Sequence, residues 1–114
     1  MIPKGVYNKK KQMNNLSDDQ VKQLSSGLYV LDFHADWCGP CRMISPLLEE
    51  LDTSNPDINF YKVDVDKETE LSTLYGIKNI PTVLMVKDGK IIKKVIGASP
   101  KLTYESAIRE LLDY

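Results

Sequence analysis

The alternation of apolar and polar positions predicts a chain of buried strands and amphipathic helices. Residues 28–35 are apolar on both alternating faces, which is typical of a central strand covered on both sides. Residues 58–65 have the composition of a second strand. Two further runs rich in β-forming residues, 82–86 and 90–96, are joined by an Asp-Gly pair, which indicates a β-hairpin.

Four segments between and around these strands have the signals of helices. Ser17, with Gln20 three residues later, predicts a capping box at the start of a short first helix. Two more helices are expected at 39–51 and 67–75, and Ser99 is expected to cap a last one. The positions expected to face inward in the last three helices are Met43, Ile44, Leu47, Leu48 and Leu51, then Leu71, Leu74 and Tyr75, then Leu102, Ala107, Ile108, Leu111 and Leu112.

The order of these elements predicts an α/β fold, with a mixed central β-sheet and helices on both of its faces. A chain of 114 residues has room for one hydrophobic core, and we assign it to a domain of residues 17–114. Residues 1–16 are a polar lead-in, in which 11–15 could add an edge strand. We interpret the lysines at 9–11 as a solvated run rather than as a binding site for an anionic partner.

Composition and charge exclude several classes of function. The 15 Lys and Arg residues against 16 Asp and Glu give a net charge of −1, which provides no positive field for nucleic acid. No stretch approaches the roughly 20 apolar residues that cross a bilayer. Residues 1–12 lack the apolar core of a signal peptide. We therefore expect a cytoplasmic monomer that binds neither nucleic acid nor membrane.

Cys38 and Cys41 are the only cysteines, and their spacing favours chemistry over structural support. A disulfide across two intervening residues would restrain little of the unfolded chain. The pair lies where a strand should pass into a helix, with Cys38 at or beside the N-cap and Cys41 one turn along. The helix start should lower the pKa of Cys38, while Cys41 is shielded and stays a thiol. Cys38 would then attack a partner's disulfide, and Cys41 would resolve the mixed disulfide.

Asp32 interrupts the apolar strand six residues before Cys38. An ionised carboxylate there would be poorly solvated, so burial should raise its pKa toward neutrality. The strand end lies under the helix start, which would put Asp32 within reach of Cys41, directly or through a water. We favour a role in proton transfer to and from Cys41. The alternative is a structural carboxylate paired with Lys62 on the next strand.

These residues belong to a longer pattern. The segment Trp37-Cys38-Gly39-Pro40-Cys41 is preceded by Asp32 and followed downstream by Ile80-Pro81-Thr82. Over about residues 17–114 the chain resembles the thioredoxin family, and in particular its reducing members. The resemblance implies a thioredoxin fold and a protein-disulfide reductase that works through a Cys38–Cys41 redox disulfide. It further implies disulfide-containing client proteins, no bound cofactor, and an NADPH-dependent flavoprotein thioredoxin reductase as electron donor, with a ferredoxin-linked donor left open.

The resemblance also assigns a substrate groove beside the cysteines. It implies that Pro81 is preceded by a cis peptide bond and faces the cysteines, and that the backbone of Ile80 binds a client strand. Without the resemblance, Pro81 would be read as an ordinary proline at the start of a strand. Gly97 and Ala98 resemble the other wall of the groove, where small residues admit a client backbone. A simple strand-end glycine is an equal alternative at Gly97.

Four more residues around the cysteines complete the candidate site. Trp37 precedes the reactive cysteine and should be a partly exposed hydrophobic wall for clients. Gly39 and Pro40 support the cysteines, and the resemblance implies that Pro40 favours the reducing form. His34 departs from the family, which usually has tryptophan there, and it should share a strand face with Asp32. It could titrate and perturb Cys38, but we favour a packed, hydrogen-bonded histidine.

Three other functions compete with disulfide reduction. A zinc site would have at most three ligands, Cys38, Cys41 and His34, where a structural site needs four, so we expect no metal. A disulfide oxidase or isomerase would fit an oxidising compartment and a different insert between the cysteines. A non-catalytic binding or clamp module could use the same surface, from Trp37 through Pro81 to Ala98.

Overall fold

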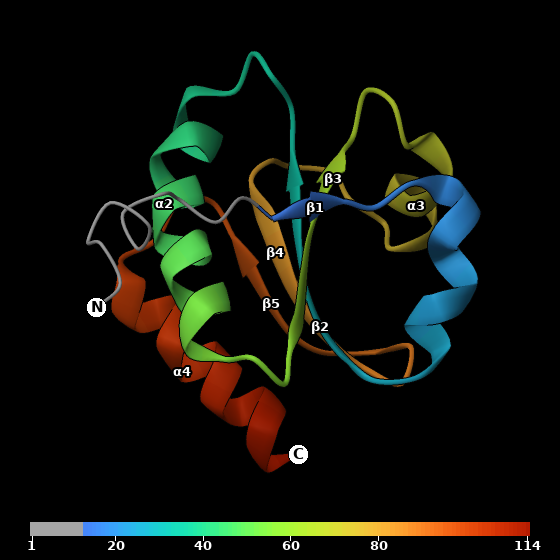
Figure 1. Cartoon of the computed structure of the whole chain (residues 1–114). Coiled ribbons are helices and arrows are strands. Elements are labelled where there is room, and N and C mark those ends of the chain that lie inside the picture. Colours follow the sequence, from blue (N-terminus) through green and yellow to red (C-terminus); the bar gives the residue numbers. More distant parts are fainter. Residues whose placement is uncertain (1–12) are drawn as a thin grey trace, which may run out of the picture.

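The computed structural model describes residues 13–114 (Figure 1). Its elements, in chain order, are β1 (Asn14–Asn15), the 3₁₀ helix η1 (Asp18–Ser25), β2 (Leu28–His34), α2 (Gly39–Ser54), β3 (Asn59–Asp64), α3 (Thr69–Leu74), β4 (Thr82–Lys87), β5 (Lys90–Ile96) and α4 (Lys101–Asp113). From η1 onward this is the predicted order of helices and strands. The division into a lead-in and a domain of residues 17–114 stays a prediction, and the lysines at 9–11 lie outside the described residues.

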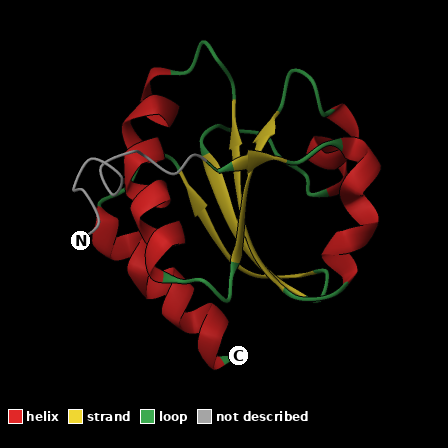
Figure 2. Ribbon diagram, viewed as in Figure 1, coloured by secondary structure: helices red, strands yellow, loops and turns green. Residues whose placement is uncertain are grey.

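The strands form one mixed sheet, as the sequence predicts. Its order is β1-β3-β2-β4-β5 (Figure 2). β1 and β2 both run parallel to β3, whereas β4 runs antiparallel to its two neighbours, β2 and β5. β1 occupies two positions of the edge strand expected at 11–15, where residues 11 and 12 lie outside the described part. β2 is the central strand, and Asp32 on it pairs with Lys62 on β3 and Val83 on β4.

Helices cover both faces of this sheet. α2 and α4 lie on one face, and η1 and α3 lie on the other (Figure 1). Alternate residues of a strand point to opposite faces, so β2 contributes to both cores. Val30 belongs to the core between the sheet and the helices α2 and α4, whereas Leu31 and Phe33 belong to the core beneath η1 and α3. The apolar pattern of residues 28–35 is explained by this double burial.

Two local turn signals are confirmed. The Gln20 side chain accepts a hydrogen bond from the Ser17 N–H at 2.9 Å, which forms the glutamine half of the predicted capping box. Between β4 and β5, Asp88 and Gly89 have φ values of 49° and 84°. Positive φ at both central residues is what a tight hairpin turn requires, so the Asp-Gly pair fixes the hairpin.

Several expected inward positions are wrong, and one cap is misplaced. Each helix presents only a narrow stripe to the sheet, and residues beside that stripe face solvent. The exposed residues are Met43 at 72%, Leu74 at 62%, Leu102 at 68% and Leu112 at 50%. The last helix has Pro100, not Ser99, as its N-cap residue, because Pro100 has an extended backbone with a ψ of 157° and the helix begins only at Lys101.

Candidate active site

The two cysteines lie where β2 gives way to α2. A two-residue turn, Asp36 and Trp37, follows the strand, and the Cys38 N–H donates to the Ala35 carbonyl at 3.1 Å. Cys38 is the N-cap residue of α2, as the sequence predicts, and Pro40 lies in its first turn. Proline fits there because the first turn of a helix does not use its N–H groups.

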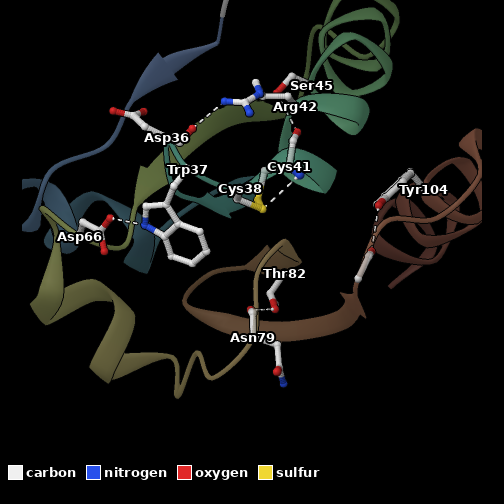
Figure 3. Close-up of a disulfide and its surroundings, with 11 residues drawn as sticks. Asp36, Trp37, Cys38, Cys41, Arg42, Ser45, Asp66, Asn79, Thr82 and Tyr104 are labelled. Atoms are coloured by element: carbon white, nitrogen blue, oxygen red, sulfur yellow. Dashed lines mark hydrogen bonds between the residues drawn. A yellow bond between two sulfur atoms is a disulfide. The ribbon is translucent and has the colours of Figure 1, made fainter.

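Cys38 and Cys41 form a disulfide with a Cα–Cα distance of 5.3 Å (Figure 3). The Cys41 N–H donates to the Cys38 sulfur at 3.2 Å, so a free N–H of the helix start is already directed at this sulfur. Both residues are buried in this oxidised state, Cys38 at 5% and Cys41 at 2% exposure, so exposure alone does not separate an attacking from a shielded cysteine. Ala35 completes their cluster, and Ile80 packs against it.

Trp37 stands beside the disulfide with its ring in solvent. The side chain is 69% exposed, which agrees with the expected open hydrophobic wall. Its indole Nε1 donates to Asp66 Oδ2 at 2.8 Å, and this bond fixes the ring next to Cys38 (Figure 3). A large apolar ring that is exposed yet held in one orientation is suited to contact another protein.

Asp32 is fully buried on the sheet face that packs against α2 and α4. Neither of its carboxylate oxygens has a hydrogen-bond partner among the described residues, Lys62 included. Burial raises the pKa of Asp32 to about 7, and the positive charge of Lys62 only partly opposes that rise. The structure therefore confirms the expected burial and direction of the pKa shift, and it holds no hydrogen-bonded Asp32–Lys62 pair.

His34 ends β2 on the same strand face as Asp32. Its Nε2 is buried without a hydrogen-bond partner within residues 13–114, so the expectation of a hydrogen-bonded histidine is wrong for this nitrogen. Burial lowers the pKa of His34, Lys62 and Lys67 lower it further, and Asp64 and Asp36 oppose them. The neutral ring is favoured because the strand end packs it away from water.

The opposite side of the site is built by the segments before β4 and after β5. The peptide bond between Ile80 and Pro81 is cis, as the resemblance implied, and Pro81 is buried. The Gly97 N–H donates to the Pro81 carbonyl at 2.8 Å, which joins the two segments. Gly97 has a φ of 86°, and Ala98 beside it is exposed. The sequence-predicted groove residues are thus adjacent in the fold.

Two residues of this region escaped the sequence analysis. Asp66, which holds the Trp37 indole, follows β3 and carries no signal that links it to the turn before α2. Tyr104, fully buried, bonds the segment after β5 through its hydroxyl. Its spacing of three, four and seven residues from Ala107, Ile108 and Leu111 would have marked it as part of the inward stripe of α4.

The described residues contain neither a cluster of metal-ligating side chains nor a helix suited to a membrane. Across residues 13–114, no three or more His, Cys, Asp or Glu side chains gather as metal ligands. In the same range, no helix combines the length and apolar character that a membrane span requires.

Comparison with known proteins identifies the family. The thioredoxin family model matches residues 8–110. The chain belongs to the thioredoxin family. Members of this family are thiol–disulfide oxidoreductases that reduce protein disulfides, and the Cys38–Cys41 disulfide has the spacing of the family's redox centre.

Relatives in sequence and structure agree with this assignment. Thioredoxin of Bacillus subtilis is 42% identical over 80% of this chain and 85% of its own length. Thioredoxin of Mycoplasmoides gallisepticum is 46% identical over 73% of this chain and 79% of its own. The oxidised crystal structure of mitochondrial thioredoxin 3 from Saccharomyces cerevisiae superposes with a TM-score of 0.76, at 32% identity, over 85% of this chain and 94% of that one. The predicted thioredoxin fold is confirmed.

Proposed function

We propose that Cys38 is the nucleophile and Cys41 the resolving thiol of this protein-disulfide reductase. The Cys38 thiolate attacks one sulfur of a client disulfide, forms a mixed disulfide, and releases the other client sulfur as a thiolate that takes up a proton. Cys41 then loses its proton and attacks the Cys38 sulfur. The mixed disulfide breaks, the second client sulfur leaves and is protonated, and the Cys38–Cys41 disulfide remains. Two electrons have passed to the client.

The observation that carries this assignment is the placement of the Cys38 sulfur at the start of α2. Cys38 is the N-cap residue and already accepts the Cys41 N–H at 3.2 Å. An anion at this point is stabilised by unpaired N–H groups and by the helix dipole. We therefore expect the reduced Cys38 thiol to have a pKa below its ordinary value, which makes it the better attacking group. Cys41 is the third residue of the helix, and within the described residues no N–H donates to its sulfur.

We infer that Asp32 accepts the proton of Cys41 during the resolving step. A carboxyl with a pKa of about 7 exchanges protons readily near neutral pH, which suits a group that must take a proton and later return it. Lys62 pairs with Asp32 across the sheet and opposes the rise of its pKa by its charge alone. A structural ion pair would instead require donors on the carboxylate, and Asp32 has none within the described residues.

The same proposal covers the client groove. Trp37 forms one exposed wall, and Gly97 and Ala98 form the other. Ile80 packs against the cysteine cluster, and Pro81, which follows it through a cis bond, has no N–H of its own to contribute to this side of the site. We infer that the backbone of Ile80 binds an extended client segment across these residues.

We further propose a cytoplasmic monomer that is recharged by an NADPH-dependent flavoprotein thioredoxin reductase. This donor returns two electrons to the Cys38–Cys41 disulfide and so closes the cycle. No bound cofactor is needed, because the exchange takes place between sulfur atoms. The alternative is a clamp module, for which the exposed Trp37 wall would also serve.

Two single substitutions test the roles of the cysteines. In insulin reduction driven by dithiothreitol, we expect Cys38→Ser and Cys41→Ser each to abolish turnover. When the pre-reduced variants are mixed with insulin after dithiothreitol has been removed, only Cys41→Ser should accumulate a covalent adduct with the client on a non-reducing gel, because only that variant keeps the attacking sulfur. Adducts trapped by Cys38→Ser instead would reverse the assignment. A double Cys38→Ser and Cys41→Ser variant that keeps its activity in cells would favour the clamp.

A further inference from the structure

Tyr104 joins the helix α4 to the wall of the client groove. The side chain is fully buried in the first turn of α4. Its hydroxyl accepts the Ser99 N–H at 3.2 Å and donates to the Gly97 carbonyl at 3.3 Å. One hydroxyl thus uses its proton and one lone pair on two backbone groups of the same three-residue segment.

This segment, residues 97–99, depends on such contacts for its position. Gly97 directly follows β5, and its φ of 86° is not a strand conformation. Its N–H donates to the carbonyl of Pro81 at 2.8 Å, while its own carbonyl accepts from Tyr104. Pro100 follows and has no N–H to donate. Hydrogen bonds therefore run from the cis-proline segment through Gly97 to a buried side chain of α4.

We propose that Tyr104 is a positioning residue for protein clients, whose hydroxyl holds residues 97–99 in the geometry that receives a client backbone. This inference rests on the proposed function, because it takes Gly97 and Ala98 as one wall of the groove. A client that binds as an extended chain needs a wall with fixed backbone groups. A small disulfide reaches the sulfur without using this wall.

The ring and the hydroxyl of Tyr104 have separable roles. The ring packs in the core with Val30, Val83 and Val95, among others. Phenylalanine would keep that packing and remove only the hydroxyl, which leaves the Gly97 carbonyl and the Ser99 N–H to water. Residues 97–99 would then sample more conformations before a client binds. The cost should appear in the binding of clients and not in the chemistry of the sulfurs.

A competing route for an effect of Tyr104 runs through Asp32. Burial raises the pKa of Tyr104, and its hydrogen bonds to Ser99 lower that pKa. The charge of Asp32 raises it further, so Tyr104 and Asp32 are electrostatically coupled. If Tyr104 acted on Asp32, its loss would change the resolving step for every disulfide. The size of the substrate therefore separates the two routes.

The test compares Tyr104→Phe with a matched control, Tyr29→Phe. Tyr29 is also buried, and its hydroxyl donates to the Gln23 carbonyl at 2.8 Å on the other face of the sheet. We expect Tyr104→Phe, which removes both hydrogen bonds of the hydroxyl, to raise KM for insulin about three- to tenfold at unchanged kcat. The rate with hydroxyethyl disulfide and its pH profile should stay at the wild-type values. Tyr29→Phe should leave both substrates unaffected.

Three results would overturn the inference. They are an unchanged KM for insulin in Tyr104→Phe, an equal loss with both disulfides, and an equal rise of KM in Tyr29→Phe. Failure of the proposed function would look different from these results. The wild-type protein would not reduce insulin, or Cys38→Ser rather than Cys41→Ser would trap the client. A wild-type pattern of trapping with an unchanged KM would remove only the role of Tyr104.

Discussion

Asp18 and Asp32 lie on opposite faces of the sheet and have opposite surroundings. Asp18, in η1, accepts the Leu71 N–H at 2.8 Å and the Glu70 N–H at 3.3 Å, both at the start of α3. Asp32, on the sheet face that packs against α2 and α4, is fully buried and has no hydrogen-bond partner within the described chain. The bonds of Asp18 join η1 to α3, whereas burial without donors favours the neutral acid at Asp32. The first aspartate supports the fold, and the second is available for proton transfer.

The two helix starts differ in the same way. At α3, the N–H groups of Glu70 and Leu71 donate to the Asp18 side chain, which comes from a distant segment. At α2, the Cys41 N–H points at the sulfur of Cys38, which becomes an anion only when the disulfide is reduced and the thiol loses its proton. A helix start whose N–H groups are not bonded to a carboxylate can instead stabilise a reactive thiolate. This comparison predicts opposite effects for the same substitution at the two aspartates.

The largest effect is expected on the stability of the oxidised protein. Burial raises the pKa of Asp32 from 3.8 to about 7, so the folded state binds its proton more tightly than the unfolded state does. Below pH 3.8 the carboxyl is protonated in both states and its contribution to the free energy of unfolding is at its maximum. That contribution falls as the pH rises from 3.8 to about 7, because the unfolded state loses the proton first. Asp32→Asn stays neutral, and we expect it to be more stable than the wild type by about 4 kcal/mol above that pH.

Denaturant unfolding at a series of pH values measures this difference. The gap between Asp32→Asn and the wild type should open as the pH rises from 3.8 to about 7 and then stay constant. Asp18→Asn is the matched control, because it makes the same change on the other face of the sheet. A variant at Asp32 that is destabilised at pH 8 would contradict the assigned surroundings of this carboxyl.

The next effect concerns the resolving step. Asp32→Asn removes the acceptor for the Cys41 proton, and we expect release of the client from the mixed disulfide to slow by about a hundredfold. The initial attack by Cys38 should change much less, so mixed disulfides with the client should accumulate. Quenching the reaction with acid and separating the products on a non-reducing gel measures both steps. If Asp32→Asn turned over as fast as the wild type throughout pH 6 to pH 9, Asp32 would be excluded as the base. This range brackets the ordinary thiol pKa of about 8.5.

The smallest effect is expected at Asp18. Asp18→Asn keeps an acceptor oxygen but removes the negative charge at the start of α3, which should lower the free energy of unfolding by about 0.5–1 kcal/mol. The rate of insulin reduction should not change, because α3 and α2 lie on opposite faces of the sheet. Thermal unfolding together with the insulin assay checks both statements. A slowed reduction at full stability would show that the two helix starts are not independent.

Much of this comparison could be predicted from local sequence. The position of Cys38 at a helix start follows from a strand that ends just before it, and the burial of Asp32 follows from apolar neighbours on both faces. The Asp-Gly hairpin likewise depends on residues adjacent in the chain. These features were predictable because their causes lie within a few residues of one another.

The remaining features depend on contacts between distant segments. Asp18 reaches the start of α3 from η1, and Asp66 reaches Trp37 from beyond β3, which no local pattern indicates. The hydroxyl of Tyr104 binds the Ser99 N–H and the Gly97 carbonyl, so a side chain of α4 contacts the segment after β5. Met43 fits an apolar stripe by spacing, yet it faces solvent on the outer side of α2, a placement that depends on how the helix is rotated against the sheet.

Individual titration of the two thiols in the reduced protein tests the central claim most directly. Alkylation rates measured across pH by mass spectrometry report each cysteine separately. The geometry at the start of α2 predicts that Cys38 ionises at least one pH unit below an ordinary thiol of about pKa 8.5, while Cys41 ionises above it. Two cysteines that both titrate near the ordinary value would contradict this account of how the protein reduces disulfides.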